Sequence, residues 1–216
     1  MRTALFILLM ISGAAIAADQ ELPPIGIELK IGSQLSLDLP FKDESGKEVW
    51  LRDFLDGKTP VLLTLVYYGC PSLCTTVLNN FTAVLKKNSW SAGKEFRIVS
   101  VSIDPRETPE LAAAKKEAYL KNYGRPEGAE GWHFLTGNET SIKKLADEAG
   151  FRYFFDEKSG EFVHVGGIFV LTPDGKVNQV LQGSRYDAKE LKEALLMAAK
   201  GRLNLVDRFK LMLNWT

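Results

Sequence analysis

Runs of apolar residues alternate with amphipathic stretches along most of the chain. Two runs, at 61–67 and 96–103, are apolar almost throughout, which is typical of strands buried on both faces of a sheet. Each run precedes a stretch with apolar residues at helical spacing, one beginning at Leu73 and the other at Pro109. Because strand and helix alternate twice, the pattern predicts parallel strands joined by crossover helices.

The rest of the pattern adds paired strands and further helices to this sheet. Alternating residues at 34–39 and 47–51, on either side of a turn sequence, predict an N-terminal β-hairpin. The helix that begins at Pro109 is expected to end at Gly124. The later elements expected are strands at 132–135, 151–155, 161–163, 167–171 and 176–181, and helices at 141–149 and from Asp187 to near Gly201. Together they predict an α/β domain with a mixed central sheet flanked by helices.

The first residues of the chain have the layout of a secretory signal peptide. Arg2 precedes an apolar run at 4–11, and small residues end at Ala17 before a polar stretch. The apolar run is shorter than the roughly 20 residues that cross a bilayer. We therefore predict a signal peptide at 1–17, a linker at 18–28, and a soluble protein exported to the periplasm. The alternative is an uncleaved segment that holds the protein at the inner membrane.

Composition narrows the class of partner. Lys and Arg number 27 in the 216 residues and Asp and Glu also number 27, so no excess of positive charge indicates nucleic acid or acidic lipid as a partner. A chain of this length can bury the core of one domain without a disulfide scaffold, and a monomer is expected. The tail at 201–216 has apolar residues at helical spacing and is expected to dock on the domain as a short helix.

The two cysteines of the chain lie together where the first apolar strand gives way to a helix. Cys70 is placed at the start of that helix, where backbone N–H groups and the helix dipole stabilise a thiolate. Cys74 follows four residues later and projects from the same face. The corresponding Cα separation of roughly 6 Å also permits a disulfide. The pair therefore indicates either a site for a soft metal or a thiol redox site, and the three intervening residues favour the metal.

Two thiolates leave a metal under-coordinated, and the chain has two histidines as strong further ligands. His133 alternates with large apolar residues in a predicted strand and is interpreted as a structural or surface residue. His164 follows the strand at 161–163 and precedes Gly166 and Gly167, small residues that allow a loop to approach another element closely. The residues alone make His164 a candidate third ligand.

The order of elements and three motifs resemble the Sco/SenC family, which are thioredoxin-fold copper proteins that serve cytochrome c oxidase assembly. The resemblance runs from about Leu29 to Ala199 and is specific only when its motifs are taken together. The motifs are Tyr-Gly-Cys-Pro-Ser-Leu-Cys at 68–74, Val-Ser-Ile-Asp-Pro at 101–105 with Glu-Thr-Pro at 107–109, and His164 before the segment 167–175.

The resemblance implies a thioredoxin-like Sco domain at 29–200. It also implies that Cys70, Cys74 and His164 bind copper as Cu(I) or Cu(II), with Asp104 near the site. For Asp104 the alternative is a turn-forming role after the strand. The neighbours of the implied ligands depart from the family pattern, which changes the contacts around the metal and hence copper affinity and partner choice. The departures are Ser72 in place of an acid, Thr75 in place of proline, and Val163 and Val165 in place of Asp and Ser.

The leading hypothesis is a copper metallochaperone, and not an enzyme, that delivers copper to cytochrome c oxidase or a similar cuproprotein. Its expected partners are an oxidase subunit and other copper chaperones. The alternative is a thiol–disulfide oxidoreductase that keeps the copper-site cysteines of a partner reduced, with Cys70 attacking and Cys74 resolving. A third reading, a docking domain with a structural disulfide, is disfavoured because so short a bridge restrains little chain.

Overall fold

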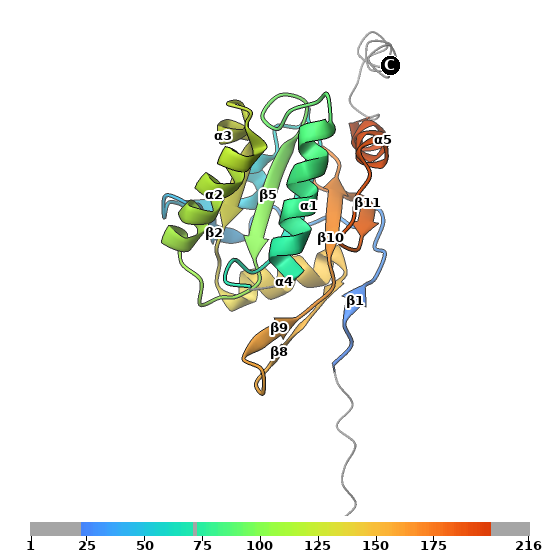
Figure 1. Cartoon of the computed structure of the whole chain (residues 1–216). Helices are drawn as coiled ribbons and strands as arrows, with labels where there is room; N and C mark the ends of the chain where they lie inside the picture. The colour runs from blue at the N-terminus through green and yellow to red at the C-terminus, as the bar shows by residue number, and fades with distance from the viewer. Residues whose placement is uncertain (1–22, 71–72, 200–216) are drawn as a thin grey trace, which may run out of the picture.

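A five-stranded mixed sheet forms the centre of the protein (Figure 1). The computed structural model describes residues 23–70 and 73–199, so the predicted signal peptide and tail lie outside the described residues. The strand order is β11-β10-β4-β5-β6, with β4, β5 and β6 parallel and β10 antiparallel to both of its neighbours. The strands are β4 (Val61–Val66), β5 (Arg97–Ser102), β6 (Trp132–Leu135), β10 (Gly167–Leu171) and β11 (Val177–Gln182).

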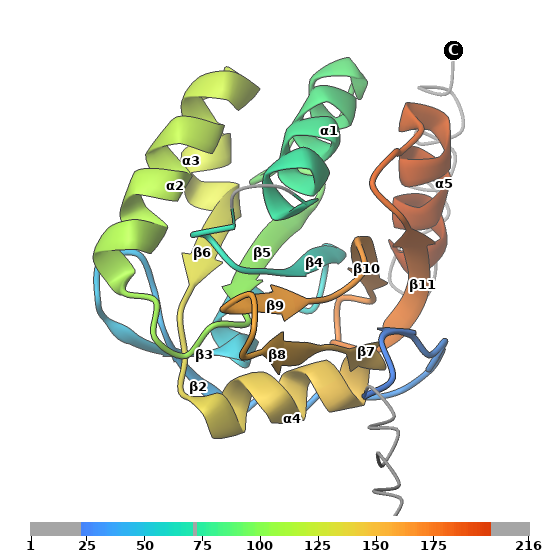
Figure 2. The same cartoon turned by 60° about the horizontal axis from the view of Figure 1, so that its bottom comes forward.

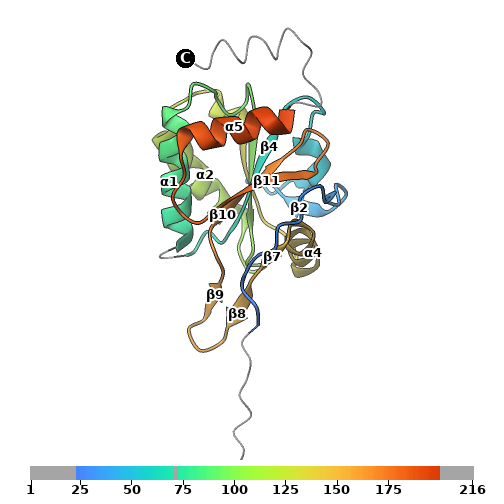
Figure 3. The same cartoon turned by 90° about the vertical axis from the view of Figure 1, so that its right-hand side faces the viewer.

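Helices cover both faces of this sheet. Figure 3 shows α1 and α2 on one face and α4 on the other, while α5 packs on β10 and β11. Within the described ranges, no helix is both long and apolar enough to span a bilayer. The helical segments are α1 (Leu73–Lys87), α2 (Pro109–Tyr123), α3 (Gly128–Gly131), α4 (Glu139–Ala149), α5 (Ala188–Ala199) and the 3-10 turn η1 (Leu51–Phe54).

The central strands and helix α2 follow the sequence pattern closely. Every residue of β4 and β10 is buried, as expected of strands covered on both faces. Helix α2 begins at Pro109, after Thr108 caps it by accepting a hydrogen bond from the Leu111 N–H, and Gly124 ends it in the left-handed region with φ of 71°. The predicted mixed α/β fold is therefore confirmed.

Two predicted strands were wrong in extent. The hairpin pairs β2 (Pro40–Lys42) with β3 (Glu48–Trp50), so its first strand is not 34–39. The Asp43 carboxylate closes the turn by accepting hydrogen bonds from the Ser45 and Lys47 N–H groups, which starts the pairing directly beside the turn. Alternation at 34–39 instead reflects burial of Leu35 and Leu39.

The predicted strand at 151–155 is divided between two small sheets. β7 (Phe151–Arg152) pairs with β1 (Gly26–Ile27), which lies inside the predicted linker. β8 (Phe154–Asp156) pairs with β9 (Glu161–Val163) in a hairpin that projects beyond the end of the central sheet (Figures 1 and 3). Figure 2 shows β9 beside the segment that leaves β4, and the Phe162 ring centroid is 5.6 Å from that of Tyr67.

His133 has contacts that fit the structural role expected of it. It lies in β6 with its ring 4.7 Å from Phe54, and its Nδ1 is 3.6 Å from Glu44 Oε1. Glu44 also pairs with Lys116 and accepts a hydrogen bond from the Phe134 N–H. Burial opposes ionisation of Glu44, but the hydrogen bonds from His133 and Lys116 outweigh burial and lower its pKa from 4.5 to about 2.

The Glu44 cluster predicts a loss of stability in acid. The folded protein holds the Glu44 carboxylate ionised while the unfolded chain binds a proton near pH 4.5, so the free energy of unfolding falls as the pH decreases from 4.5 toward 2. A Glu44→Gln variant should be less stable at neutral pH and should lose less stability across that acid range. Urea unfolding at a series of pH values measures both effects, and an unchanged slope would contradict the assignment.

Candidate metal centre

The loop that leaves β4 and the first turn of α1 carry the two cysteines. Cys70 and Cys74 are not joined by a disulfide and both are buried, with 6% and 2% of their surfaces exposed. The Cys74 N–H points at Cys70 Sγ over 3.4 Å, and the Tyr67 N–H points at Cys74 Sγ over 3.5 Å. Each sulfur therefore faces a backbone N–H. The donor at Cys70 belongs to the first turn of α1, as expected of a helix start, and the donor at Cys74 belongs to the residue after β4.

His164 reaches this loop from the segment between β9 and β10. Its Nε2 lies 2.9 Å from Cys74 Sγ, and its Nδ1 lies 2.9 Å from the Val165 carbonyl oxygen. Because a carbonyl oxygen only accepts, we assign the ring proton to Nδ1, which leaves the lone pair of Nε2 directed at Cys74. Burial lowers the pKa of His164, against the opposing effect of the Val165 hydrogen bond, so the imidazole is neutral and able to act as a ligand.

The structure thus brings together two of the three candidate ligands, Cys74 and His164, which are 90 residues apart in sequence. Cys70 is adjacent through its contact with the Cys74 backbone. Within residues 23–70 and 73–199, no group of three or more His, Cys, Asp or Glu side chains is already gathered as a metal site. The Cys70 side chain also hydrogen-bonds that of Cys74, so Cys70 borders the pair.

Burial controls the protonation of Cys74. Removal from water raises the pKa of the Cys74 thiol well above its usual range, although the hydrogen bond from the Tyr67 N–H acts in the opposite direction. The metal-free protein therefore keeps Cys74 as a thiol, which donates to the neutral Nε2 of His164.

Aromatic side chains enclose the pair. The Tyr67 ring meets His164 edge-on at 6.0 Å, and the Phe151 ring is 5.8 Å from His164. The pKa of Tyr67 is raised by burial and by a hydrogen bond with the Cys70 side chain, which places its hydroxyl against that sulfur. This role of Tyr67 is not visible in the sequence, because an aromatic residue in an apolar strand gives no sign that its hydroxyl faces a cysteine.

Asp104 is engaged in its own turn. Its carboxylate accepts hydrogen bonds from the Arg106 backbone at 2.9 Å and from the Arg106 guanidinium at 2.7 and 2.8 Å. These contacts support the turn-forming alternative for Asp104.

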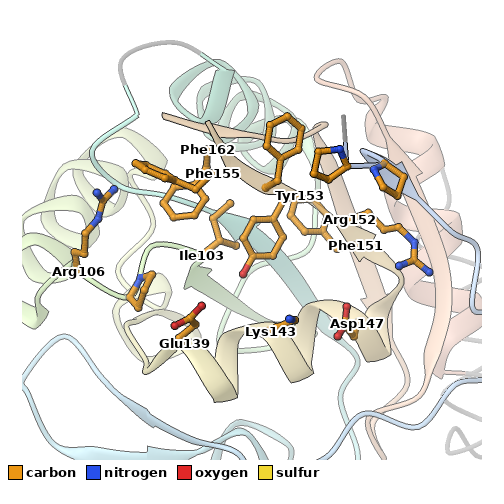
Figure 4. Close-up of a pocket in the computed structure, with 14 residues that line it drawn as sticks. Ile103, Arg106, Glu139, Lys143, Asp147, Phe151, Arg152, Tyr153, Phe155 and Phe162 are labelled. Atoms are coloured by element: carbon orange, nitrogen blue, oxygen red, sulfur yellow. The ribbon is translucent and has the colours of Figure 1, made fainter. Parts of the chain in front are cut away.

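A groove lies beside the site. It encloses about 560 Å³, and the aromatic residues of β7, β8 and β9 face α4 across it (Figure 4). Phe151 and Phe162 line the groove and also contact His164 and Tyr67 respectively, so the aromatic wall of the site continues into it. Arg106 also lines the groove, and its guanidinium lies 4.7 Å from the centre of the Phe155 ring.

Gly166 allows the segment carrying His164 to approach α1. A Cβ at this position would lie 2.5 Å from the Gly183 carbonyl oxygen and 2.8 Å from Val77 Cγ2. Both distances are shorter than the 3.0 Å that Cβ atoms keep from other heavy atoms, so a side chain at Gly166 would displace the segment. The sequence-based expectation of a close approach at these glycines is confirmed.

A Gly166→Ala variant should therefore move His164 away from Cys74. Overpacking of this kind is expected to lower the free energy of unfolding by about 1–3 kcal/mol. The imidazole resonances of His164 in the NMR spectrum report the displacement. Gly160→Ala is the control, because Gly160 has φ of 71° with nothing near its Cβ position. That variant should lose stability through backbone strain and leave the His164 resonances unchanged; unchanged resonances in Gly166→Ala would contradict the prediction.

Comparisons with known proteins match this chain to one family. The model of the family described as SCO1/SenC matches residues 32–200. A SCO2-like protein of Rickettsia typhi is 29% identical over 160 residues, which cover 68% of each chain.

Solved structures have the same fold. The crystal structure of an Aquifex aeolicus VF5 protein matches with a TM-score of 0.68 and 24% identity, covering 79% of this chain and 95% of that one. Arabidopsis thaliana ScoI with copper bound matches with a TM-score of 0.59 and 20% identity, covering 79% and 99%. Bradyrhizobium japonicum ScoI with copper bound matches with a TM-score of 0.54 and 23% identity, covering 80% and 99%. These likenesses confirm the thioredoxin-like fold.

Proposed function

Because this chain belongs to the SCO1/SenC family, we propose that it is an exported copper-binding protein that delivers copper to cytochrome c oxidase or a similar cuproprotein. The observation that carries the proposal is the contact of Cys74 Sγ with His164 Nε2 at 2.9 Å. Two proteins of similar fold, from Arabidopsis thaliana and Bradyrhizobium japonicum, have solved structures with copper bound.

The donor set suits copper. Cys70 and Cys74 supply sulfur, and His164 supplies an imidazole nitrogen whose lone pair already faces Cys74. Thiolate and imidazole donors in a low-coordinate set favour Cu(I). A metal with three ligands can still accept a ligand from the recipient protein. Transfer of copper from one protein to another requires such an open position.

The surrounding residues support binding without supplying ligands. The Val165 carbonyl holds the Nδ1 proton of His164 and thereby fixes the imidazole with Nε2 toward Cys74. The rings of Tyr67 and Phe151 keep water from the imidazole. We propose an oxidase subunit as the recipient, other copper chaperones as further partners, and the periplasm as the compartment.

A second candidate function is a thiol–disulfide reductase acting on the cysteines of a copper-receiving partner. The observation that favours it is the Cys74 N–H directed at Cys70 Sγ, since such a donor stabilises the thiolate that attacks a disulfide. In that reaction the Cys70 thiolate would attack the partner's disulfide, forming a mixed disulfide and releasing one partner thiol. Cys74 would then attack Cys70 Sγ, forming the Cys70–Cys74 disulfide and releasing the second partner thiol.

Titration of the reduced protein with Cu(I), in competition with a chromophoric chelator, tests the ligand set. The wild type should bind one equivalent, and Cys70→Ser, Cys74→Ser and His164→Ala should each weaken binding by more than about tenfold, because loss of a ligand costs at least as much as loss of a supporting contact. His133→Ala removes the other histidine and is the matched control, with wild-type affinity expected. His164→Ala with wild-type affinity would refute the assignment.

Trapping of a mixed disulfide distinguishes the reductase function from copper delivery. A reductase with Cys74→Ser should accumulate a mixed disulfide at Cys70 when mixed with an oxidised partner peptide, and His164→Ala should exchange thiols at the wild-type rate. Mass spectrometry detects the adduct. A copper carrier without reductase activity gives no lasting adduct with that peptide.

A further inference from the structure

Glu107 binds the backbone of the loop that leads to Cys70. Its Oε2 accepts a hydrogen bond from the Tyr68 N–H at 2.8 Å, and its Oε1 accepts one from the Gly69 N–H at 2.5 Å. The Ser102 hydroxyl, at the end of β5, donates to Oε2 at 2.5 Å. One half-buried carboxylate therefore joins the ends of two neighbouring parallel strands.

These hydrogen bonds are of a strong kind. A carboxylate that accepts from backbone N–H groups forms shorter and stronger hydrogen bonds than a neutral acceptor. Two successive N–H groups bound to the two oxygens fix the orientation of both peptide planes. Gly69 permits the approach, since a Cβ there would lie 3.2 Å from Glu107 Oε1.

The loop is fixed on its other side by the Tyr68 side chain. The buried Tyr68 hydroxyl lies 2.8 Å from the carbonyl oxygens of Ser100 in β5 and Leu135 in β6. Tyr68 is thus held at its ring by the sheet and at its backbone by Glu107. The residue after Gly69 is Cys70, so the position of the Cys70 sulfur depends on this anchored segment.

The turn that follows β5 directs the Glu107 side chain toward the cysteine loop. The Glu107 N–H donates to the Asp104 carbonyl oxygen at 3.1 Å, which closes the turn after β5. Asp104, the acid that the family resemblance placed near the site, is occupied by Arg106. Of the two acids in this turn, Glu107 is the one that contacts the cysteine loop.

We propose that Glu107 is a positioning residue for the copper site, whose carboxylate holds the Tyr68–Gly69 backbone so that the Cys70 sulfur stays within reach of Cys74 and His164. This inference rests on the proposed function, because it takes Cys70 as a ligand. Glu107 acts through the backbone of the loop.

The direction of the change in Cu(I) affinity distinguishes a positioning role of Glu107 from a purely electrostatic one. A negative charge near two cysteines disfavours their thiolates, so removing a carboxylate that acted by charge alone would strengthen Cu(I) binding. Removing a carboxylate that positions Cys70 should weaken it. Glu161, exposed on β9, provides a matched acid near the site that makes no contact with the cysteine loop among the described hydrogen bonds.

The experiment compares the full-length wild type, Glu107→Gln and Glu161→Gln. Glu107→Gln keeps the shape of the side chain but replaces one acceptor oxygen with a donor amide, so one loop N–H loses its partner. We expect Cu(I) affinity to fall by about 10–100-fold in Glu107→Gln, the usual effect of losing a residue that orients a ligand, and to stay at or above the wild-type value in Glu161→Gln. Equal affinity in Glu107→Gln and wild type, or an equal loss in both variants, would overturn the proposal.

A second readout needs no copper. In the reduced metal-free protein, the amide protons of Tyr68 and Gly69 should be protected from hydrogen exchange in the wild type and exchange faster in Glu107→Gln. If Glu107→Gln does not fold, the wild-type measurement still decides: exchange of both amides at the rate of exposed loop amides overturns the proposal. A wild type that binds no Cu(I) would refute the proposed function, while the amide comparison would still determine whether Glu107 holds the loop.

Discussion

The antiparallel pairing of β10 with β4 determines where the chemistry of this protein lies. Thr64 pairs with Ile168 and Val61 with Leu171, so the end of β4 lies beside the beginning of β10. The chain leaves β4 toward the cysteines and enters β10 from His164. One strand register therefore brings together segments that are distant in sequence. A shift of this register by one residue would turn the side chains of β10 to the opposite face and separate the pair.

This dependence explains which parts could be predicted from the sequence. Continuous apolar runs mark β4 and β5, and Thr108 with Gly124 marks the ends of α2, because these signals act within a few residues. The meeting of His164 with the cysteine loop was predictable from the fold implied by the family resemblance. The boundaries of the β2–β3 hairpin were not predictable, because the pairing of two three-residue strands depends on turn side chains such as Asp43.

Contacts that single side chains make across the sheet could not be predicted from the pattern of apolar and polar residues. Glu107 reads as one acid in a polar turn, and Tyr67 as one more apolar residue at the end of a strand. Their partners come from elements whose relative position is fixed only after the sheet has formed: the Tyr68 and Gly69 N–H groups for Glu107, and the His164 ring for Tyr67. Residues of this kind are recognised from the folded structure and rarely from spacing.

The thiol of Cys74 faces the neutral imidazole of His164, and a single proton lies between them in the metal-free protein. A metal ion at this place would occupy the lone pairs that this proton now uses. Under the proposed function, copper loading would exchange one cation for another, and uptake of the metal would release protons to the solvent. The acidity of the compartment would then shift the balance between loaded and empty protein, and a recipient with its own ligands would remove copper most readily where protons are abundant.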